Sequence, residues 1–411
     1  MRNIVHTLVG SRLIAAIVVV MSVARGSHAQ TYQVLYSFAG GSDGANPYGT
    51  LIKDSQNNLY GTTVSGGDVN CRLYGCGTVF RLSSLGTKTT LVNFQGTPDG
   101  AGPSGGVIRA GGVLYGTTAE GGPYHNDAGT IFKVSASGKE SLLYSFQGGS
   151  DGADPWSTLV RDSAGNLYGT TTVGGNFANN YCAQNGCGTV FKIDATGYHT
   201  VLHTFSGPDG ATPLEGLVRD AAGNLYGTTG AGGSSGCDVG CGVIYKIDPA
   251  GNETLVHEFL GYTADGAGPN SNLIIDQSGN LYGTASAGGA FGSGIIYELS
   301  STGVYTILHS FNGKSGGANP QTGVIRDGKG NLYGTTYAGG KISCNPYTNG
   351  CGVVYKLSRT GQFTVLHTFT GTPDGANPSW GSLLRDWSGN IYGLAANGGA
   401  SGNGAIFKIT P

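Results

Sequence analysis

The sequence has few charged residues, almost no methionine and no long apolar run after its first residues. Charged residues make up 11% of the 411 positions, and the two methionines, Met1 and Met21, both lie near the N-terminus. After residue 30, no stretch reaches the roughly 18 apolar residues of a membrane-spanning helix, and no long helical periodicity occurs. We therefore expect no transmembrane segment in the mature chain and no helical bundle.

The first 29 residues have the pattern of a secretory signal peptide. Arg2 and Arg12 give a positive start, Leu13 to Val23 is a short apolar run, and Ser27-His28-Ala29 offers small residues for cleavage. We predict that residues 1–29 are removed and that the protein is secreted, to the cell exterior or the periplasm.

The remaining chain, residues 30–411, is acidic. Removal of the three arginines in the leader changes the formal net charge from −2 to −5. A mildly acidic surface with so few charges argues against nucleic acid as a partner. We expect one domain and a monomer.

Glycine is abundant, with 77 residues, and it marks a repeat. A Leu-Tyr-Gly-Thr phrase, Ile-Tyr-Gly-Leu in the last copy, recurs every 51 to 59 residues. Its tyrosines are Tyr60, Tyr115, Tyr168, Tyr226, Tyr282, Tyr333 and Tyr392. A period of this size is typical of stacked supersecondary units.

Each repeat contains four short apolar runs, which we predict to be strands A to D. In the third repeat they are Ser157–Asp162, Asn166–Thr171, Thr189–Ile193 and Thr200–Phe205. The A–B turn holds glycine in five repeats and Asn57 in the first, so we predict a positive φ there. The A–B and C–D turns are short, whereas the B–C and D–A connections are long and variable. Alternating strands place these long connections on one face, which we predict to be the binding face.

The chain begins on a strand D (33–38) and ends on a strand C (404–409). One four-stranded unit is therefore divided between the two ends, as in a closed ring. We predict an all-β, seven-bladed β-propeller of four-stranded antiparallel blades, closed by strand 33–38 pairing with strand 404–409. The alternative is an open β-solenoid, whose last repeat would not need a strand from the N-terminus.

The phrases GNLYGTT, GTVFK, TVLHxF and DGANP together resemble the GloVer (Gloeo/Verruco) repeat of choice-of-anchor extracellular bacterial proteins, over residues 33–409. The resemblance implies a secreted or surface-attached bacterial repeat protein without an established catalytic activity, so no catalytic residue is carried over. Many members have an anchoring tail, whereas this chain ends at Pro411 directly after the last strand. The A–B phrase is also similar to NHL and gluconolactonase-like propellers, which supports the fold only.

Eight cysteines form four close pairs in B–C connections. The pairs are Cys71/Cys76, Cys182/Cys187, Cys237/Cys241 and Cys344/Cys351. In an exported chain we predict four local disulfides. Zinc is the alternative, but it needs tighter spacing and two pairs brought together, so we expect no metal here.

Two further repeated positions suggest scaffold roles. Strand D carries His203, His257, His309 and His367, and we align Tyr36, Asn93 and Tyr144 with them. A position shared by these residue types is expected to be structural. An Asp-Gly-Ala-x-Pro phrase recurs in the D–A connection, with Gly316 in place of its aspartate in the sixth copy. We predict turn formers, with calcium binding as the alternative and no other cofactor.

Positions where the repeats differ are better candidates for ligand contacts. Directly after the proline of that phrase the chain places Tyr48, Ser104, Trp156, Leu214, Asn270, Gln321 and, after a one-residue insertion, Trp380. In the fourth repeat, Glu215 directly follows Leu214. We predict ligand binding by Tyr48, Trp156, Trp380, Asn270, Gln321 and Glu215, supplemented by loop residues Tyr74, Tyr124, Tyr181, Tyr347, Asn70, Asn126, Asn179, Asn180, Asn345 and Asn349. Aromatic and amide side chains suit a sugar ring or an extended peptide, although the aromatics could instead plug the channel.

These features favour a non-enzymatic binding propeller for an extracellular carbohydrate or protein. The alternative is a propeller enzyme of lactonase, lyase or glycosidase type, which would need paired carboxylates or metal ligands near the channel. A purely structural envelope component is the third possibility.

Overall fold

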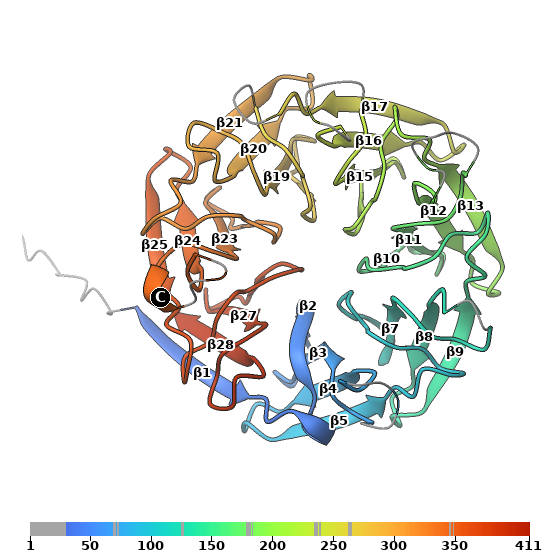
Figure 1. Cartoon of the computed structure of the whole chain (residues 1–411), viewed down its shortest axis with the longest axis horizontal. Coiled ribbons are helices and arrows are strands. Elements are labelled where there is room, and N and C mark those ends of the chain that lie inside the picture. The colour runs from blue at the N-terminus through green and yellow to red at the C-terminus, as the bar shows by residue number, and fades with distance from the viewer. Residues whose placement is uncertain are drawn as a thin grey trace, which may run out of the picture.

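Seven four-stranded sheets surround a central axis in the computed structural model (Figure 1). The structure describes residues 30–411 except 69–70, 72–73, 125–126, 178–181, 183, 234–236, 238–239, 262–264, 345–346 and 348. The predicted signal peptide lies outside this part. The described chain contains strands and two short 3-10 helices, η1 (Gly41–Asp43) and η2 (Ile342–Cys344), but no α-helix.

Each blade contributes strands A to D from the channel to the rim. Blade 1 is β2 (Ala45–Lys53), β3 (Leu59–Ser65), β4 (Thr78–Leu82) and β5 (Lys88–Asn93), and blade 2 is β6 (Ile108–Ala110), β7 (Val113–Thr118), β8 (Thr130–Val134) and β9 (Glu140–Ser145). Blade 3 is β10 (Val160–Arg161), β11 (Leu167–Thr171), β12 (Thr189–Ile193) and β13 (His199–Thr204), and blade 4 is β14 (Val218–Arg219), β15 (Leu225–Thr229), β16 (Val243–Ile247) and β17 (Glu253–Glu258). Blade 5 is β18 (Ile274–Ile275), β19 (Leu281–Ala285), β20 (Ile295–Leu299) and β21 (Tyr305–Ser310), and blade 6 is β22 (Ile325–Arg326), β23 (Leu332–Thr336), β24 (Val353–Leu357) and β25 (Phe363–Thr368). Blade 7 is β26 (Leu384–Arg385), β27 (Ile391–Ala395), β28 (Ala405–Thr410) and β1 (Thr31–Ser37).

Ring closure follows the prediction. β1 pairs antiparallel with β28, with Tyr32 opposite Ile409, and completes the sheet β1-β28-β27-β26. The seven-bladed propeller is thus confirmed, with strand limits that differ by a few residues from those expected. Lys53 of blade 1 also contacts Asp386 of blade 7 at 3.0 Å, which links the two ends of the ring near the A–B turns.

Strand A is shorter than the sequence suggests. In blade 3 the expected strand 157–162 is reduced to Val160–Arg161, and only β2 has its full length. The reason is crowding around the channel, because a Cβ on Gly105, which lies before the shortened β6 of blade 2, would be 2.6 Å from the carbonyl oxygen of Ser157 in the next blade. The inner part of strand A therefore contacts neighbouring blades and leaves the regular ladder of its own sheet.

The core consists of aromatic contacts between blades. Phe205, directly after β13, and Tyr245 of β16, in the next blade, are fully buried and meet edge to face with centroids 5.0 Å apart. Gly227, the glycine of the repeated phrase, lies opposite Tyr245, whose hydroxyl would clash with any Cβ there. The phrase therefore needs glycine because the strand C aromatic ring occupies the space of a side chain.

The A–B turn is held by the tyrosine of the repeated phrase and by the asparagine two positions before it. Asp162 accepts hydrogen bonds from the backbone and side chain of Asn166, at 2.9 and 2.7 Å, and from Tyr168 Oη at 3.1 Å. The same arrangement occurs at Asp54, Asp220, Asp276, Asp327 and Asp386. The positive φ predicted in this turn is confirmed, for example 94° at Gly165 and 65° at Asn57.

Candidate functional site

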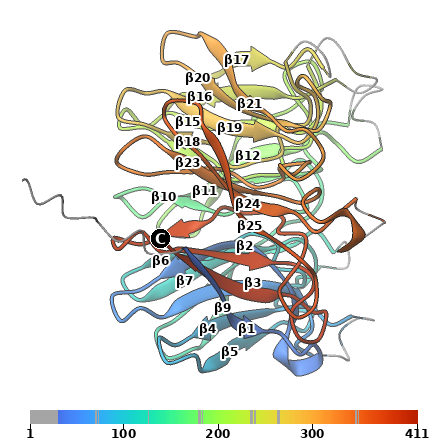
Figure 2. The ribbon, with the colours of Figure 1, turned by 90° about the vertical axis from the view of Figure 1, so that its left-hand side faces the viewer.

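The long connections lie along one side of the disc and the short turns along the other (Figure 2). On the long-connection face, the Asp-Gly-Ala-x-Pro phrase joins each blade to the preceding one. Its x residue has a left-handed backbone in all seven copies, with φ between 51° and 63°. These residues are Asn46, Gly102, Asp154, Thr212, Gly268, Asn319 and Asn377.

The proline of this phrase packs against the glycine before strand C of the preceding blade. A Cβ on Gly188 would lie 2.6 Å from Cδ of Pro213 and would also clash with the carbonyl oxygen of Thr171. The N–H of Thr212 donates to the carbonyl of Cys187 at 3.0 Å. The phrase is therefore a link between blades, and we call it the interblade lock.

The aspartate of the lock is held by strand D. Its carboxylate accepts hydrogen bonds from a backbone N–H and from a tyrosine hydroxyl or histidine ring, as in Tyr36–Asp43 at 2.7 Å and His203–Asp209 at 3.0 Å. The same pairing joins Tyr144 to Asp151, His257 to Asp265 and His367 to Asp374. The strand D histidines thus have the structural role that was predicted.

One alignment made from the sequence is wrong. The residue in register with His203 is Val92 rather than Asn93, because Val79 pairs with Val92 as Val190 pairs with His203. In the copy that has Gly316 instead of aspartate, His309 stacks on Phe363 at 4.0 Å and burial lowers its pKa. In blade 1 the aspartate is kept although its strand D partner is replaced, and in the copy with Gly316 the histidine is kept, so the two positions do not change together and the sequence holds no signal for the pairing.

The four disulfides join the predicted pairs, Cys71–Cys76, Cys182–Cys187, Cys237–Cys241 and Cys344–Cys351. The second cysteine of each pair supplies the carbonyl that accepts the N–H of the next interblade lock. Each disulfide therefore fixes a B–C connection directly beside the junction with the following blade. No group of three or more potential metal ligands occurs among the described residues.

Two tryptophans meet at the mouth of the channel. Trp156 of blade 3 and Trp380 of blade 7 are both half-buried, and their rings meet edge to face with centroids 5.9 Å apart. Trp380 has a φ of 52°, unusual for a bulky residue, and its carbonyl accepts the N–H of Gly49 from blade 1 at 2.8 Å. The inserted residue before Trp380 thus allows blade 7 to place an indole ring against that of blade 3.

Glu215 lies beside the two indoles. A cavity of about 10 Å³, room for one water molecule, is lined by Trp156, Trp380 and Glu215, with Ser104, Thr158 and Leu214. Glu215 is only 6% exposed, and its carbonyl accepts a hydrogen bond from Thr170 of blade 3 at 3.1 Å. Burial raises the pKa of Glu215 to about 8, although the N–H of Gly216 acts in the opposite direction. The carboxyl group is therefore mostly protonated at neutral pH.

The other predicted ligand-binding residues do not line this cavity. Tyr48 precedes Gly49 in β2, and burial raises its pKa. Asn270 lies against Gly230 of blade 4, and its Oδ1 is buried without a hydrogen-bond partner. Gln321 is half-buried. These three residues occupy the repeat position of the tryptophans on blades 1, 5 and 6. Of the six predicted ligand-binding residues, the structure therefore brings only Trp156, Trp380 and Glu215 together.

Around the channel, neighbouring blades are joined by contacts that the sequence analysis missed. Thr158 accepts the N–H of Gly106 at 3.0 Å, Asn272 accepts that of Gly216 at 2.9 Å, and Thr50 accepts that of Ser382 at 2.8 Å. Polar side chains from blades 1, 3 and 5 thus bridge to the backbone of a neighbouring blade. The alternation of glycine with polar residues three positions after the proline was the available signal.

Of the loop residues proposed from the sequence, Tyr74, Tyr124, Tyr347 and Asn349 are exposed. Tyr181, Asn70, Asn126, Asn179, Asn180 and Asn345 lie outside the described residues.

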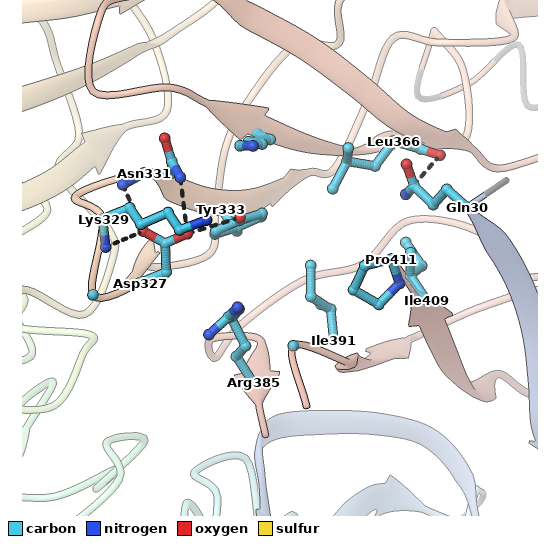
Figure 3. Close-up of a pocket in the computed structure, with 13 residues that line it drawn as sticks. Gln30, Asp327, Lys329, Asn331, Tyr333, Leu366, Arg385, Ile391, Ile409 and Pro411 are labelled. Atoms are coloured by element: carbon cyan, nitrogen blue, oxygen red, sulfur yellow. Dashed lines mark hydrogen bonds between the residues drawn. The ribbon is translucent and has the colours of Figure 1, made fainter. Parts of the chain in front are cut away.

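Larger cavities occur between blades on the short-turn face. A groove of about 420 Å³ separates blades 6 and 7 (Figure 3). Asp327, Asn331 and Tyr333 form one wall, and Arg385 and Ile391 form the other. Grooves of about 510 and 590 Å³ lie between blades 7 and 1 and between blades 5 and 6.

These grooves repeat the Asp-Asn-Tyr wall that holds each A–B turn, so their residues are explained by the scaffold. The channel mouth is different, because its tryptophans and its glutamate interrupt the repeat at single blades. We therefore take Trp156, Trp380 and Glu215 as the candidate functional site.

Two solved structures share the fold. They are the extracellular domains of a hybrid two component system and of a one component system, both from B. thetaiotaomicron, with TM-scores of 0.55 and 0.54 and identities of 13% and 11%. The alignments cover 93% and 92% of this chain but 41% and 40% of those chains. This chain thus spans about two fifths of the length of these neighbours, and at such identity the likeness shows the fold alone.

A gluconolactonase from Xanthomonas campestris is a more distant neighbour. It is 16% identical, with a TM-score of 0.41 over 74% of this chain and 85% of that chain. No curated protein matches the sequence. A family model does match, that of the Gloeobacter/Verrucomicrobia repeat, over residues 19–183 and 178–346. These matches cover most of the chain and confirm the resemblance noted in the sequence, so the chain belongs to the Gloeobacter/Verrucomicrobia repeat family.

Proposed function

We propose that this protein is an exported, non-enzymatic propeller that binds an extracellular carbohydrate or protein at its channel mouth. The observation that carries the proposal is the meeting of Trp156 and Trp380 over Glu215. The scaffold does not demand these residues, since other blades place tyrosine, serine, leucine, asparagine or glutamine where the tryptophans stand. Half-buried indoles offer large, rigid surfaces for stacking at little entropic cost.

Export is supported by several features together. Four disulfides are typical of an oxidising compartment, and both structural neighbours quoted above are extracellular domains. No helix in the described chain has the length and apolarity to span a membrane. The leader at residues 1–29 remains a prediction from the sequence.

The enzyme alternative draws support from Glu215 alone. A protonated carboxyl group can act as a general acid, but glycoside cleavage by the usual route uses two carboxyl groups about 5–10 Å apart. Glu215 is the one carboxyl group lining the described cavity. Release of reducing sugar from a bound glycan by the purified protein would favour catalysis over binding.

The tryptophans provide the test, because the chain has only three. Trp387 lies in an A–B turn on the opposite face and is fully exposed, so it serves as a matched control. A glycan-array screen of residues 30–411 would first identify a ligand. We expect Trp156→Ala and Trp380→Ala to weaken its binding by about 1–3 kcal/mol, whereas Trp387→Ala leaves the affinity unchanged.

Thermal midpoints of the same variants separate binding from plugging. If the indoles only fill the channel, truncation should destabilise the fold by about 3–5 kcal/mol, as for core tryptophans, and leave the affinity unchanged. That result would contradict the assignment of the mouth as a binding site.

A further inference from the structure

Glu215 occupies a position at which the scaffold does not require a carboxyl group. The other six blades place small, uncharged residues in this register, namely Gly49, Gly105, Ser157, Ser271, Thr322 and Gly381. A carboxyl group that is 6% exposed is costly to bury. Its presence in blade 4 alone therefore points to a local requirement at the mouth.

The surroundings of Glu215 lack a counter-charge and offer aromatic faces instead. Among the residues that share its cavity, Gly49, Ser104, Gly105, Thr158, Leu214 and Gly381, no cation occurs. The remaining lining consists of the indoles of Trp156 and Trp380, and indole faces attract cations. A buried carboxylate beside two indoles is thus complementary to a positively charged ligand group.

The size of the cavity restricts which cation can enter. Its volume of about 10 Å³ corresponds to one water molecule. A primary ammonium group is close to water in size, whereas a quaternary ammonium group would require the two indoles to move apart. The exposed parts of the indoles could then stack on a sugar ring, with the amides of Asn270 and Gln321 in the same register on blades 5 and 6.

The negative charge of the long-connection face also favours a cationic ligand. The acidic residues of the described D–A and B–C connections are Asp43, Asp68, Asp99, Glu120, Asp127, Asp151, Asp154, Asp209, Asp265 and Asp374. Their basic counterparts in that part of the chain are Lys314 and Lys341. Asp43 is paired with Lys88 at 3.1 Å and the lock aspartates lie beside strand D, so the negative charge belongs to the face as a whole. Such an excess raises the local concentration of a cation near the protein and its rate of association.

We propose that the channel mouth binds the primary ammonium group of an amino sugar between Trp156, Trp380 and the carboxyl group of Glu215. This inference rests on the proposed binding function of the mouth and specifies its ligand class.

Binding should be coupled to proton release. In the empty site burial raises the pKa of Glu215 to about 8, so the group is protonated at pH 5.5. The amine of an amino sugar is less basic than an alkylamine because of its neighbouring oxygens, but it is still charged at that pH. The ammonium group favours the carboxylate, which requires Glu215 to lose its proton. None of the other residues lining the cavity titrates in this range, and Tyr48, next to Gly49, has a raised pKa of its own. Affinity should therefore rise with pH, by up to about tenfold per unit below pH 7.

The experiment compares two tetrasaccharides that differ only in charge, tetra-glucosamine and its fully N-acetylated form. Calorimetry of the protein at pH 5.5, in buffers of different ionisation enthalpy, gives affinities and proton release. We expect the amino form to bind at least tenfold more tightly and to release close to one proton. Glu215→Gln should abolish both the preference and the release, whereas Trp387→Ala should keep both. If Glu215→Gln does not fold, Glu215→Ser replaces it, since blades 3 and 5 use serine at this position.

The outcomes separate this inference from the function on which it rests. Equal affinity for both tetrasaccharides, or a preference that persists in Glu215→Gln, would overturn the ammonium site while leaving a glycan-binding mouth intact. A Gly-Lys-Gly peptide that competes as well as the amino sugar would overturn the assignment to a sugar. No binding of either tetrasaccharide, together with a glycan array without hits, would also overturn the proposed function as far as it concerns a carbohydrate ligand.

Discussion

The interblade lock and the channel mouth are adjacent along each strand A, yet they follow opposite rules. The lock repeats its left-handed residue and proline in all seven blades, because every junction between blades needs the same close approach. Two residues after that left-handed residue, the mouth carries tyrosine, serine, tryptophan, leucine, asparagine and glutamine in turn. Positions that are the same in every blade thus serve the packing of the ring, whereas positions that differ between blades are where a ligand can be recognised.

The largest effect should come from breaking the ring itself. Deletion of residues 30–39 removes β1, which pairs with β28, and Phe38, which meets Phe80 edge to face at 5.2 Å. The exposed edge of β28 and the lost aromatic contacts should abolish cooperative unfolding of the native ring. Thermal unfolding followed by near-UV circular dichroism measures this. A truncated chain with the parental midpoint would count against the need for closure.

Disrupting one interblade lock should cause the next largest loss of stability. Gly188 and Gly197 have nearly the same backbone, with φ of 90° and 94°. Only at Gly188, however, would an added methyl group have neighbours within 4 Å, among them Pro213. Gly197→Ala should cost about 1 kcal/mol of unfolding free energy through backbone strain. Gly188→Ala should cost at least about 2 kcal/mol more, since the methyl group would separate two blades. Equal losses in urea denaturation would show that backbone strain alone explains the glycine.

The smallest change in stability is expected at the one interblade lock that departs from the common pattern. Thr212 has a φ of 59°, where the other six locks use glycine, asparagine or aspartate, and a β-branched residue is strained in this conformation. Thr212→Asn should therefore stabilise the fold by about 1 kcal/mol in urea denaturation, with its backbone bonds to Cys187 and Gly230 retained. A destabilised variant would indicate that the threonine side chain itself supports blade 4.

The candidate site was only partly predictable from the sequence. Trp156, Trp380 and Glu215 were found because they break the repeat, but their meeting around one cavity depends on blades 3, 4 and 7. Tyr48, Asn270 and Gln321 share the repeat position of the tryptophans and yet do not line the cavity, since side chains on a curved ring turn toward different neighbours. The shortened strand A was missed for a related reason, because its inner residues approach the adjacent blade and bond to their own sheet through side-chain hydroxyl groups, as Ser157 does with Thr170, instead of through the backbone ladder.

By itself, the sequence determined the number of blades, the divided blade, the disulfide pairs and the left-handed turn residues. Each of these depends on the period or on residues close together in the chain, so local chemistry was sufficient. The tertiary structure alone decided the partner of each strand D histidine, the hydrogen bonds of Thr50, Thr158 and Asn272 to neighbouring blades, and the burial that raises the pKa of Glu215. Those features depend on how closely neighbouring blades approach, and that distance is set by the closing of the whole ring.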